Sequence, residues 1–361
     1  MSAEFGAVPA GQLSKLQHLY RRHLYLDAYS LTADLWKPST NIQDLSLDEL
    51  VIGGRLAARL GGVRLSRWLL REALKRDPTK PLVRFFSRHL RSPKLRLLDD
   101  LRAFNAQPDL GGDDPELRAA WYASYAYTWA TLRDFERAQE CLTAAHRLFP
   151  DDSWILSCES TVLGMEDRWT DALICAERAW NLDPGAPFAA SSLGTSLLHL
   201  GRVEESADRL EDASEKSQSF QVVVEASWHQ CALAETLEGE ERRQRLERAR
   251  ALADNLPRFA PLADRDTEMA FARVKLDAAE LADDHPEIER WSSKLRVPFH
   301  RQRLRNLQKT LCRQANPAAI STDYPEAPDL RTRQCCGGAV SEWRHHFGRG
   351  DGGGGHLRGN L

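Results

Sequence analysis

Residues 153–184 decide the fold of this chain, and they read SWILSCESTVLGMEDRWTDALICAERAWNLDP. Residues 119–150 match them at a spacing of 34 and read AAWYASYAYTWATLRDFERAQECLTAAHRLFP. Each stretch ends on a proline, Pro150 or Pro184, that follows a run of helix-forming residues. The eighth, twentieth and twenty-seventh positions of both stretches carry small side chains, namely Ala126, Ala138 and Ala145 in one and Ser160, Ala172 and Ala179 in the other.

The same pattern occurs in two further stretches, residues 187–218 and residues 47–78. Their small positions hold Gly194, Ser206 and Ala213, and Gly54, Ser66 and Ala73. The seventeenth position holds a large side chain in all four stretches, namely Val63, Phe135, Trp169 and Val203. Such self-similarity at a fixed period is the signature of a repeat architecture.

Each repeat is predicted to form two short amphipathic helices that pack antiparallel. Small side chains allow two helix backbones to approach closely, and a large one fills the space beside the turn. Proline ends the second helix because it lacks an N–H and restricts the residue before it. A single helix pair cannot bury its apolar face, so neighbouring pairs stack and share a continuous core. The sequence therefore predicts an all-α fold.

The spacing and the residue choice resemble the tetratricopeptide repeat (TPR) family. This resemblance implies a right-handed α-solenoid over residues 12–295, with residues 1–11 as an N-terminal tail. Weaker helix pairs flank the four clear repeats. The first two are residues 11–38, with Ala33 and Pro38 at the last two repeat positions, and residues 82–108, which are broken by Pro93. The third is residues 221–256, which begin with the β-prone Gln221 to Val224 and break at Gly239. The fourth is residues 262–295, which break at His285 and Pro286.

The composition excludes several classes of protein. The 361 residues carry a net charge of −3, which does not suit a nucleic-acid binder. No run of eighteen apolar residues occurs, so no transmembrane helix and no membrane partner are expected. Residues 1–11 lack the basic and apolar regions of a secretory signal. Seven cysteines are too sparse for a disulfide framework, so a cytoplasmic location is predicted.

The first helices of the repeats supply the candidate binding surface. In the TPR family, the second, fifth, ninth, twelfth and thirteenth positions of a repeat face a concave groove. Transferred to the three repeats that start at residues 119, 153 and 187, these fifteen positions contain no Lys or Arg. The candidate groove residues are Tyr127, Trp154, Thr161, Met165, Phe188, Thr195, Leu198 and His199.

An aromatic, weakly polar groove suits an extended peptide, an amphipathic helix or another part of the same chain. TPR domains that clamp a peptide C-terminal carboxylate use Lys, Arg and Asn at such positions. Ala123 and Tyr127 occupy two of these positions here, which disfavours a receptor for chaperone tails. The alternative interpretation is that Tyr127, Trp154 and Phe188 only pack between repeats, because burial is the common fate of aromatic side chains.

No cofactor or metal site is predicted. Cys335 and Cys336 precede a His-rich stretch, but adjacent cysteines seldom ligate one zinc ion. The four cysteines within the repeats, at positions 141, 158, 175 and 231, are predicted to be small core residues. The glycine run at residues 352–355 is followed by His356, which makes it a linker and not a phosphate-binding loop.

A more specific resemblance involves three segments of the first repeats. They read LYRRHLYLDAY at residues 19–29, IGGRLA at residues 52–57 and RDP at residues 76–78. They look like bacterial TPR proteins that carry a C-terminal cysteine peptidase domain of the bacteriocin-processing type. In those proteins a Val-Pro-Phe segment opens the papain-like domain, and this chain has Val297-Pro298-Phe299 at that place.

The peptidase pattern then stops. Lys309 stands near the expected nucleophile, and Cys312 is a weak candidate whose neighbours do not fit. Papain-like catalysis also needs a histidine partner, and only 49 residues follow Cys312. Residues 296–314 are therefore predicted to be a remnant of a peptidase-domain start. Residues 315–361, rich in Gly and Arg, resemble an out-of-frame reading and are predicted to be disordered.

The sequence thus predicts a non-catalytic scaffold that binds a protein or peptide in its groove. A truncated relative of a repeat-plus-peptidase protein, with thiol hydrolase chemistry, is the alternative. In a third possibility, the solenoid held only its own peptidase domain, through an intramolecular contact that full-length relatives would show.

Overall fold

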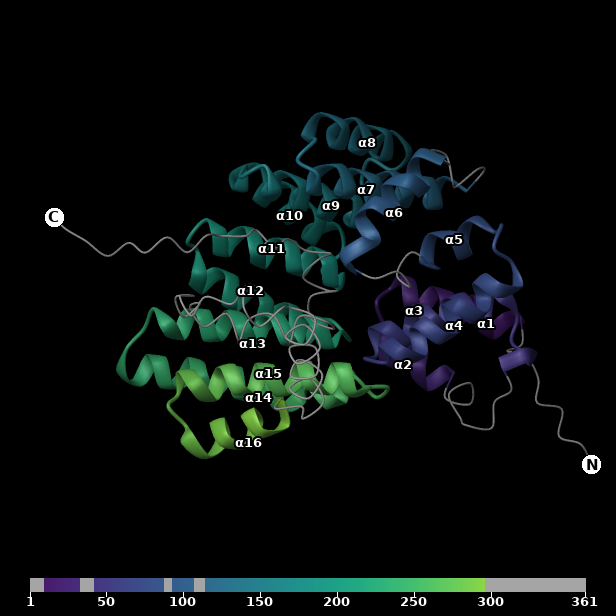
Figure 1. The fold of residues 1–361 in the computed structure, drawn as a ribbon. Helices are drawn as coiled ribbons and strands as arrows, with labels where there is room; N and C mark the ends of the chain where they lie inside the picture. The colour runs from purple at the N-terminus through teal and green to yellow at the C-terminus, as the bar shows by residue number, and fades with distance from the viewer. Residues whose placement is uncertain (1–9, 33–41, 88–92, 107–113, 296–361) are drawn as a thin grey trace, which may run out of the picture.

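The computed structural model describes residues 10–32, 42–87, 93–106 and 114–295. These residues form helices and no strand. Figure 1 shows the helices following one another in antiparallel pairs, so the predicted all-α solenoid is confirmed. The helices are α1 (Ala10–Arg21), α2 (Tyr25–Leu31), the 3-10 helix η2 (Ile42–Asp44), α3 (Leu47–Arg59), α4 (Val63–Arg76), α5 (Pro81–Ser87), α6 (Pro93–Ala106), α7 (Pro115–Thr131), α8 (Phe135–Leu148), α9 (Ser153–Met165), α10 (Trp169–Leu182), α11 (Pro187–His199), α12 (Val203–Lys216), α13 (Phe220–Glu235), α14 (Gly239–Phe259), α15 (Arg265–Leu281) and α16 (His285–Leu295).

The helix boundaries follow the repeat register. The first helices α3, α9 and α11 begin at the first repeat position, while α7 begins four residues earlier at Pro115. The second helices α4, α8, α10 and α12 begin at the seventeenth position, on the four large residues. The large side chain at that place therefore opens the second helix directly after the turn.

All twelve small positions are buried. The clearest case is the eighth position, where Gly54 faces Leu70 and Gly194 faces Leu210. A Cβ atom added to Gly54 would lie 2.8 Å from Leu70 Cγ, and one added to Gly194 would lie 2.5 Å from Leu210 Cδ1. The small residues thus let the two helices of a repeat approach closely, as the sequence predicts.

One turn geometry joins the two helices in every clear repeat. The fifteenth position has a left-handed backbone, with φ of 85° at Gly61, 66° at Arg133, 61° at Asp167 and 74° at Gly201. The next N–H donates to the carbonyl five residues back, as in Arg168 to Leu163 (2.9 Å). This bond satisfies a carbonyl that the end of the first helix would otherwise leave open.

The flanking units use parts of the same plan. His23, between α1 and α2, and Asp283, between α15 and α16, repeat the left-handed turn at φ of 58° and 51°. The stretch around Val222 is helical within α13, because it packs as the first helix of a pair. The predicted breaks mark helix starts: Pro93 begins α6, Gly239 begins α14 and His285 begins α16. Ala33 and Pro38 lie outside the described residues.

The core runs along the chain in overlapping clusters. One cluster joins α9 to α12 and α13 through Leu156, Leu197, Leu210 and Val222. Its neighbours join α13, α14 and α15 on one side and α7, α8 and α9 on the other. Apart from Leu262, which packs against the cluster of α1, α2 and α3, each cluster is built from helices that are near in sequence. This is the packing expected of a solenoid.

The chain also curves back on itself. In Figure 1 the N-terminal helices α2 and α3 lie beside the ends of α13, α14 and α15. Two backbone bonds join the regions, from Leu262 N–H to Leu60 O and from Asp264 N–H to Gly61 O, both 3.1 Å. The described helices therefore form a closed ring, and the contact that closes it is called the seam below.

Candidate functional site: the groove and the seam

The candidate groove residues lie on α7, α9 and α11. Within this set, His199 is exposed and the others are half-buried. They reach the surface with part of the side chain while the rest packs inside. The residues so placed are Tyr127, Trp154, Thr161, Met165, Phe188, Thr195 and Leu198.

Two of these side chains contribute to the core. Trp154 packs against the cluster of Ala119, Ala123, Ala145 and Ile155. Met165 packs against a second cluster, around Leu142. Packing between repeats therefore accounts for part of their surface, as the alternative interpretation has it.

The α9–α11 contact is rich in small hydroxyls. Ser160 Oγ lies 3.4 Å from Ser196 Oγ, and Ser192 donates to the Ser157 carbonyl at 3.3 Å. The Thr161 hydroxyl donates within its own helix, to the Ser157 carbonyl at 2.9 Å. Small satisfied hydroxyls of this kind allow two first helices to stack closely without leaving unpaired polar groups.

His199 makes a parallel stacking contact with an aromatic ring. Its ring stacks on Trp169 with centroids 3.6 Å apart and an angle of 3° between the planes. Burial lowers the pKa of His199, although the nearby Asp167 acts in the opposite direction. A neutral imidazole fixed on an indole presents one donor and one acceptor at its edge.

Phe188 is the groove residue whose partner the sequence prediction missed. The guanidinium of Arg59 lies over its ring, with Cζ 4.5 Å from the centroid. The same group donates to Gln221 Oε1 at 2.8 Å. Arg59 stands at the thirteenth position of the repeat that starts at Leu47, and Arg55 at its ninth. Applying the groove register to this fourth repeat would have revealed both cations.

Arg55 and Arg59 change the chemistry around two tyrosines. The Arg55 guanidinium carbon lies 4.4 Å from the Tyr20 ring centroid and 4.1 Å from that of Phe86. Burial pushes the pKa of Tyr20 up, but the positive charges of Arg55 and Arg59 outweigh it and lower that pKa. Burial raises the pKa of Tyr25 well above its usual value. Stacking between rings holds both guanidinium groups in place.

A second set of seam contacts ties α2 to the ends of α10 and α12. His23 Nε2 lies 2.9 Å from Asp183 Oδ2. The Leu26 N–H donates to Gln218 Oε1 at 2.8 Å. Burial opposes the charge on Asp183, but the hydrogen bond and the charge of His23 lower the pKa of this carboxyl.

The third set lies at the Gly61 turn. Thr267 donates its hydroxyl to the Gly61 carbonyl at 2.6 Å, and the Arg64 N–H donates to Asp264 Oδ2 at 2.7 Å. The turn needs glycine for two reasons. The φ of Gly61 is left-handed at 85°, and a Cβ atom there would lie 3.0 Å from Ala260 Cβ.

The described cysteines lie in environments that favour the neutral thiol over the thiolate. Burial raises the pKa of Cys141 to about 11 and the pKa values of Cys175 and Cys231 to about 12. Burial also raises the pKa of Cys158. His146 Nε2 pairs with Glu159 Oε2 at 2.9 Å, but that carboxylate raises the Cys175 pKa further. A thiolate nucleophile needs the opposite environment.

The described residues meet the requirements neither of a metal site nor of a membrane-spanning helix. The described residues contain no cluster of His, Cys, Asp and Glu that could hold a metal ion. None of the helices described is long and apolar enough to cross a membrane. Cys312, Cys335 and Cys336, together with the predicted peptidase remnant and tail, lie outside the described residues.

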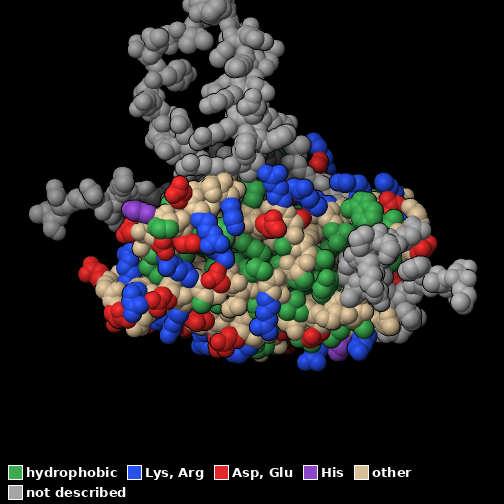
Figure 2. Space-filling view, turned by 90° about the horizontal axis from the view of Figure 1, so that it is seen from below, with side chains coloured by type: hydrophobic (Ala, Val, Ile, Leu, Met, Phe, Trp, Pro, Cys, Tyr) green, Lys and Arg blue, Asp and Glu red, His purple; other side chains and the backbone are tan. Residues whose placement is uncertain are grey.

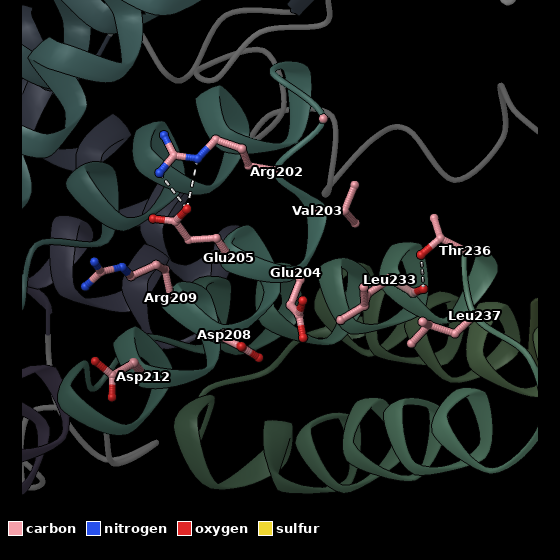
Figure 3. A pocket seen from close by; sticks show the side chains of 11 residues that line it. Arg202, Val203, Glu204, Glu205, Asp208, Arg209, Asp212, Leu233, Thr236 and Leu237 are labelled. Atoms are coloured by element: carbon pink, nitrogen blue, oxygen red, sulfur yellow. Dashed lines mark hydrogen bonds and ion pairs between the residues drawn. The ribbon is translucent and has the colours of Figure 1, made fainter.

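A hollow of about 920 Å³ lies between α12 and α13. Figure 3 shows charged side chains of α12 on one side and Leu233 and Leu237 on the other. Arg202 and Glu205 neutralise each other at 2.6 Å. Figure 2 shows acidic and basic side chains intermixed over part of one face, with hydrophobic side chains between them. A surface of mixed charge has no strong preference for either sign of partner.

Comparison with known proteins gives little beyond the helices. No protein-family model matches the chain, and no curated protein matches it. Solved structures that are similar in shape include the following two. One is the crystal structure of the APC/C hetero-tetramer Cut9–Hcn1, with a TM-score of 0.46 and 16% identity over 79% of this chain. This chain spans about half, 54%, of the matched chain.

The second is a monomeric mutant of IFIT1 with m7Gppp-AAAA. Its TM-score is 0.45, with 15% identity over 83% of this chain and 74% of that one. Similarity at this level does not extend to function.

Proposed function

We propose that this protein is a non-catalytic scaffold that binds a protein or peptide in the groove formed by α7, α9 and α11. The observation that carries the proposal is the row of half-buried groove side chains, which ends in the His199–Trp169 stack. Flat aromatic surfaces beside fixed donors and acceptors suit a peptide that adds both apolar contacts and hydrogen bonds.

The chemistry of the groove narrows the partner. Its open part carries hydroxyl, apolar and imidazole groups, and the cation that lies over Phe188 is Arg59 of the N-terminal helices. An uncharged extended peptide or the apolar face of an amphipathic helix fits such a surface. One part of the groove is already occupied by the protein itself, because Arg59 of α3 lies over Phe188.

The binding unit is proposed to be the repeat domain of residues 12–295, in a reducing cytoplasm. The four described cysteines form no disulfide, which is compatible with that compartment. The proposal includes no nucleic acid, membrane, metal or cofactor among the partners.

The test is affinity capture from the native host with the full chain. Thr195→Arg places a long cation in the groove on a half-buried position of α11. Asn181→Arg is the matched control, because it adds the same side chain at an exposed position of α10. A groove partner is retained by the wild type and the control and lost with Thr195→Arg. Equal capture by all three proteins would refute the groove as the contact surface.

The alternative is a truncated relative of a repeat-plus-peptidase protein. It is motivated by the segment at residues 296–299 and by Cys312. A working peptidase would show thiol-dependent cleavage that Cys312→Ala abolishes, whereas a scaffold shows none. Sequencing the gene tests the out-of-frame origin of the tail, since a one-base change should then restore a peptidase-like reading.

A further inference from the structure

The seam differs in its chemistry from the contacts between neighbouring helices. The hydrophobic clusters of the described residues join elements that are neighbours along the chain. Leu262 is the one cluster member that crosses the seam, where it packs beside Leu60 and Leu56. The other seam contacts include hydrogen bonds, ion pairs, the Arg59–Phe188 stack and the close approach of the Gly61 turn to Ala260 and Thr267.

Polar contacts of this kind cost little to break. Water replaces each hydrogen bond when the surfaces part, so the net contribution of one bond is only about 1 kcal/mol. The His23–Asp183 pair is weakened further by solvent, because 39% of the Asp183 side chain is exposed. A core cluster offers no such replacement, since its apolar area is exposed to water on opening.

Each side of the seam has hydrophobic clusters of its own. The N-terminal side has two clusters, around Leu56 and around Leu50. The far side has the clusters of α9 to α15. The aromatic cluster of Phe85, Phe104 and Trp121 still joins the two sides through α5, α6 and α7. Small polar interfaces between such units permit relative motion by default.

We propose that the seam is a latch: the ring opens there as a unit while the helices on both sides stay folded. Opening removes Arg59 from Phe188 and frees Gln221 and Gln218, which lengthens the groove toward α13. Use of this added surface by a partner rests on the proposed function. The opening itself does not.

Four of the backbone amides that donate across the seam serve as reporters of the latch. The N–H groups of Leu26, Arg64, Leu262 and Asp264 donate across the seam, to Gln218, Asp264, Leu60 and Gly61 respectively. Hydrogen exchange measures the opening of individual amides and distinguishes local opening from global unfolding. The experiment is hydrogen–deuterium exchange of the full chain, with fragmentation that resolves single amides.

The expected result is that the four amides exchange at similar protection, at least about 100-fold faster than core amides of α3 and α13. The double variant Arg59→Gln, Gln218→Ala should raise the exchange of the Arg64, Leu262 and Asp264 amides about tenfold further, which corresponds to about 1.4 kcal/mol. Leu26 does not count in this comparison, because Gln218 is the acceptor of its N–H. Core amides should keep their wild-type rates. Asn255→Ala, an exposed change on α14, is the control and should alter neither set.

Two results would overturn the latch. One is that the four amides exchange only as slowly as the core in the wild type, which needs no variant and no folding assumption. The other is that the double variant accelerates seam and core amides alike. Neither result bears on the capture experiment with Thr195→Arg, so failure of the latch and failure of the groove are distinguishable.

Discussion

The repeats of α7 to α12 and the seam show two ways in which one chain makes contacts. The repeats use the same small residues at the same places, and each contact joins helices close in sequence. The seam joins residues 129 to 206 positions apart, through contacts that do not recur in the other repeats. Periodic contacts supply the stability of the solenoid, and the unique contacts set where its ends meet.

The largest expected effect is the loss of a core side chain in a repeat. Leu210 is 1% exposed and fills the space opposite Gly194. Leu210→Ala should lower the free energy of unfolding by about 3 kcal/mol, since it leaves a cavity. Urea denaturation followed by circular dichroism measures it. Leu200→Ala, at a side chain that is 37% exposed, should cost far less. Equal losses would contradict the repeat packing.

The second prediction adds one methyl group. Gly194→Ala gains helix propensity, but its Cβ would lie 2.5 Å from Leu210 Cδ1. Overpacking should win and lower stability by about 1–2 kcal/mol. The matched change is Gly185→Ala, where the nearest atom is 3.5 Å away. A stabilised Gly194→Ala would show that the helices are not in close contact, which would undo the explanation of the small positions.

The sequence could predict the repeats because their contacts are local and periodic. Ala138, Ala172 and Ser206 recur at one place because three helix pairs have the same packing requirement. The groove helices were also predictable, since the register assigns α9 and α11. The seam was not, because the contacts of Gln218, Asp264 and Gly61 join residues about 190 to 206 positions apart and do not recur at the repeat spacing. Arg59 was predictable from the groove register, because it lies at the thirteenth position of the repeat that starts at Leu47.

The third prediction concerns the seam and pH. His23 lowers the pKa of Asp183, so this pair contributes stability above the unfolded pKa of about 3.9 and loses it as pH falls through the lower folded value. In Asp183→Asn, the free energy of unfolding should therefore fall less steeply as the pH is lowered. The loss at neutral pH should be below about 1 kcal/mol, because solvent screens the half-exposed pair.

Denaturation from pH 7 down to pH 2 measures this effect. Asp151→Asn is the control, at a carboxylate that is 74% exposed and 3.7 Å from Arg178. If the free energy of unfolding falls with pH equally in the wild type, Asp183→Asn and Asp151→Asn, the His23 contact does not form in solution.

The smallest expected effect lies in a repeat turn. Asp167 holds φ of 61°, where Gly61 and Gly201 stand in equivalent turns. Asp167→Gly should raise the melting temperature slightly, by a gain of about 0.5 kcal/mol, because glycine adopts this backbone without steric cost. Gly201→Asp is the reciprocal change and should destabilise the chain by a similar amount. Opposite signs would show that the four turns differ in solution.

Ring closure is the central claim, and a photo-cross-link at the seam tests it most directly. The full chain carries p-benzoylphenylalanine in place of Leu262, which lies beside the Leu16, Tyr20 and Leu60 cluster. Mass spectrometry then locates the cross-link in a mixture of heavy and light chains. The closed ring predicts intrachain cross-links to residues 52–62. Cross-links confined to α14 and α15, or formed between heavy and light chains, would contradict it.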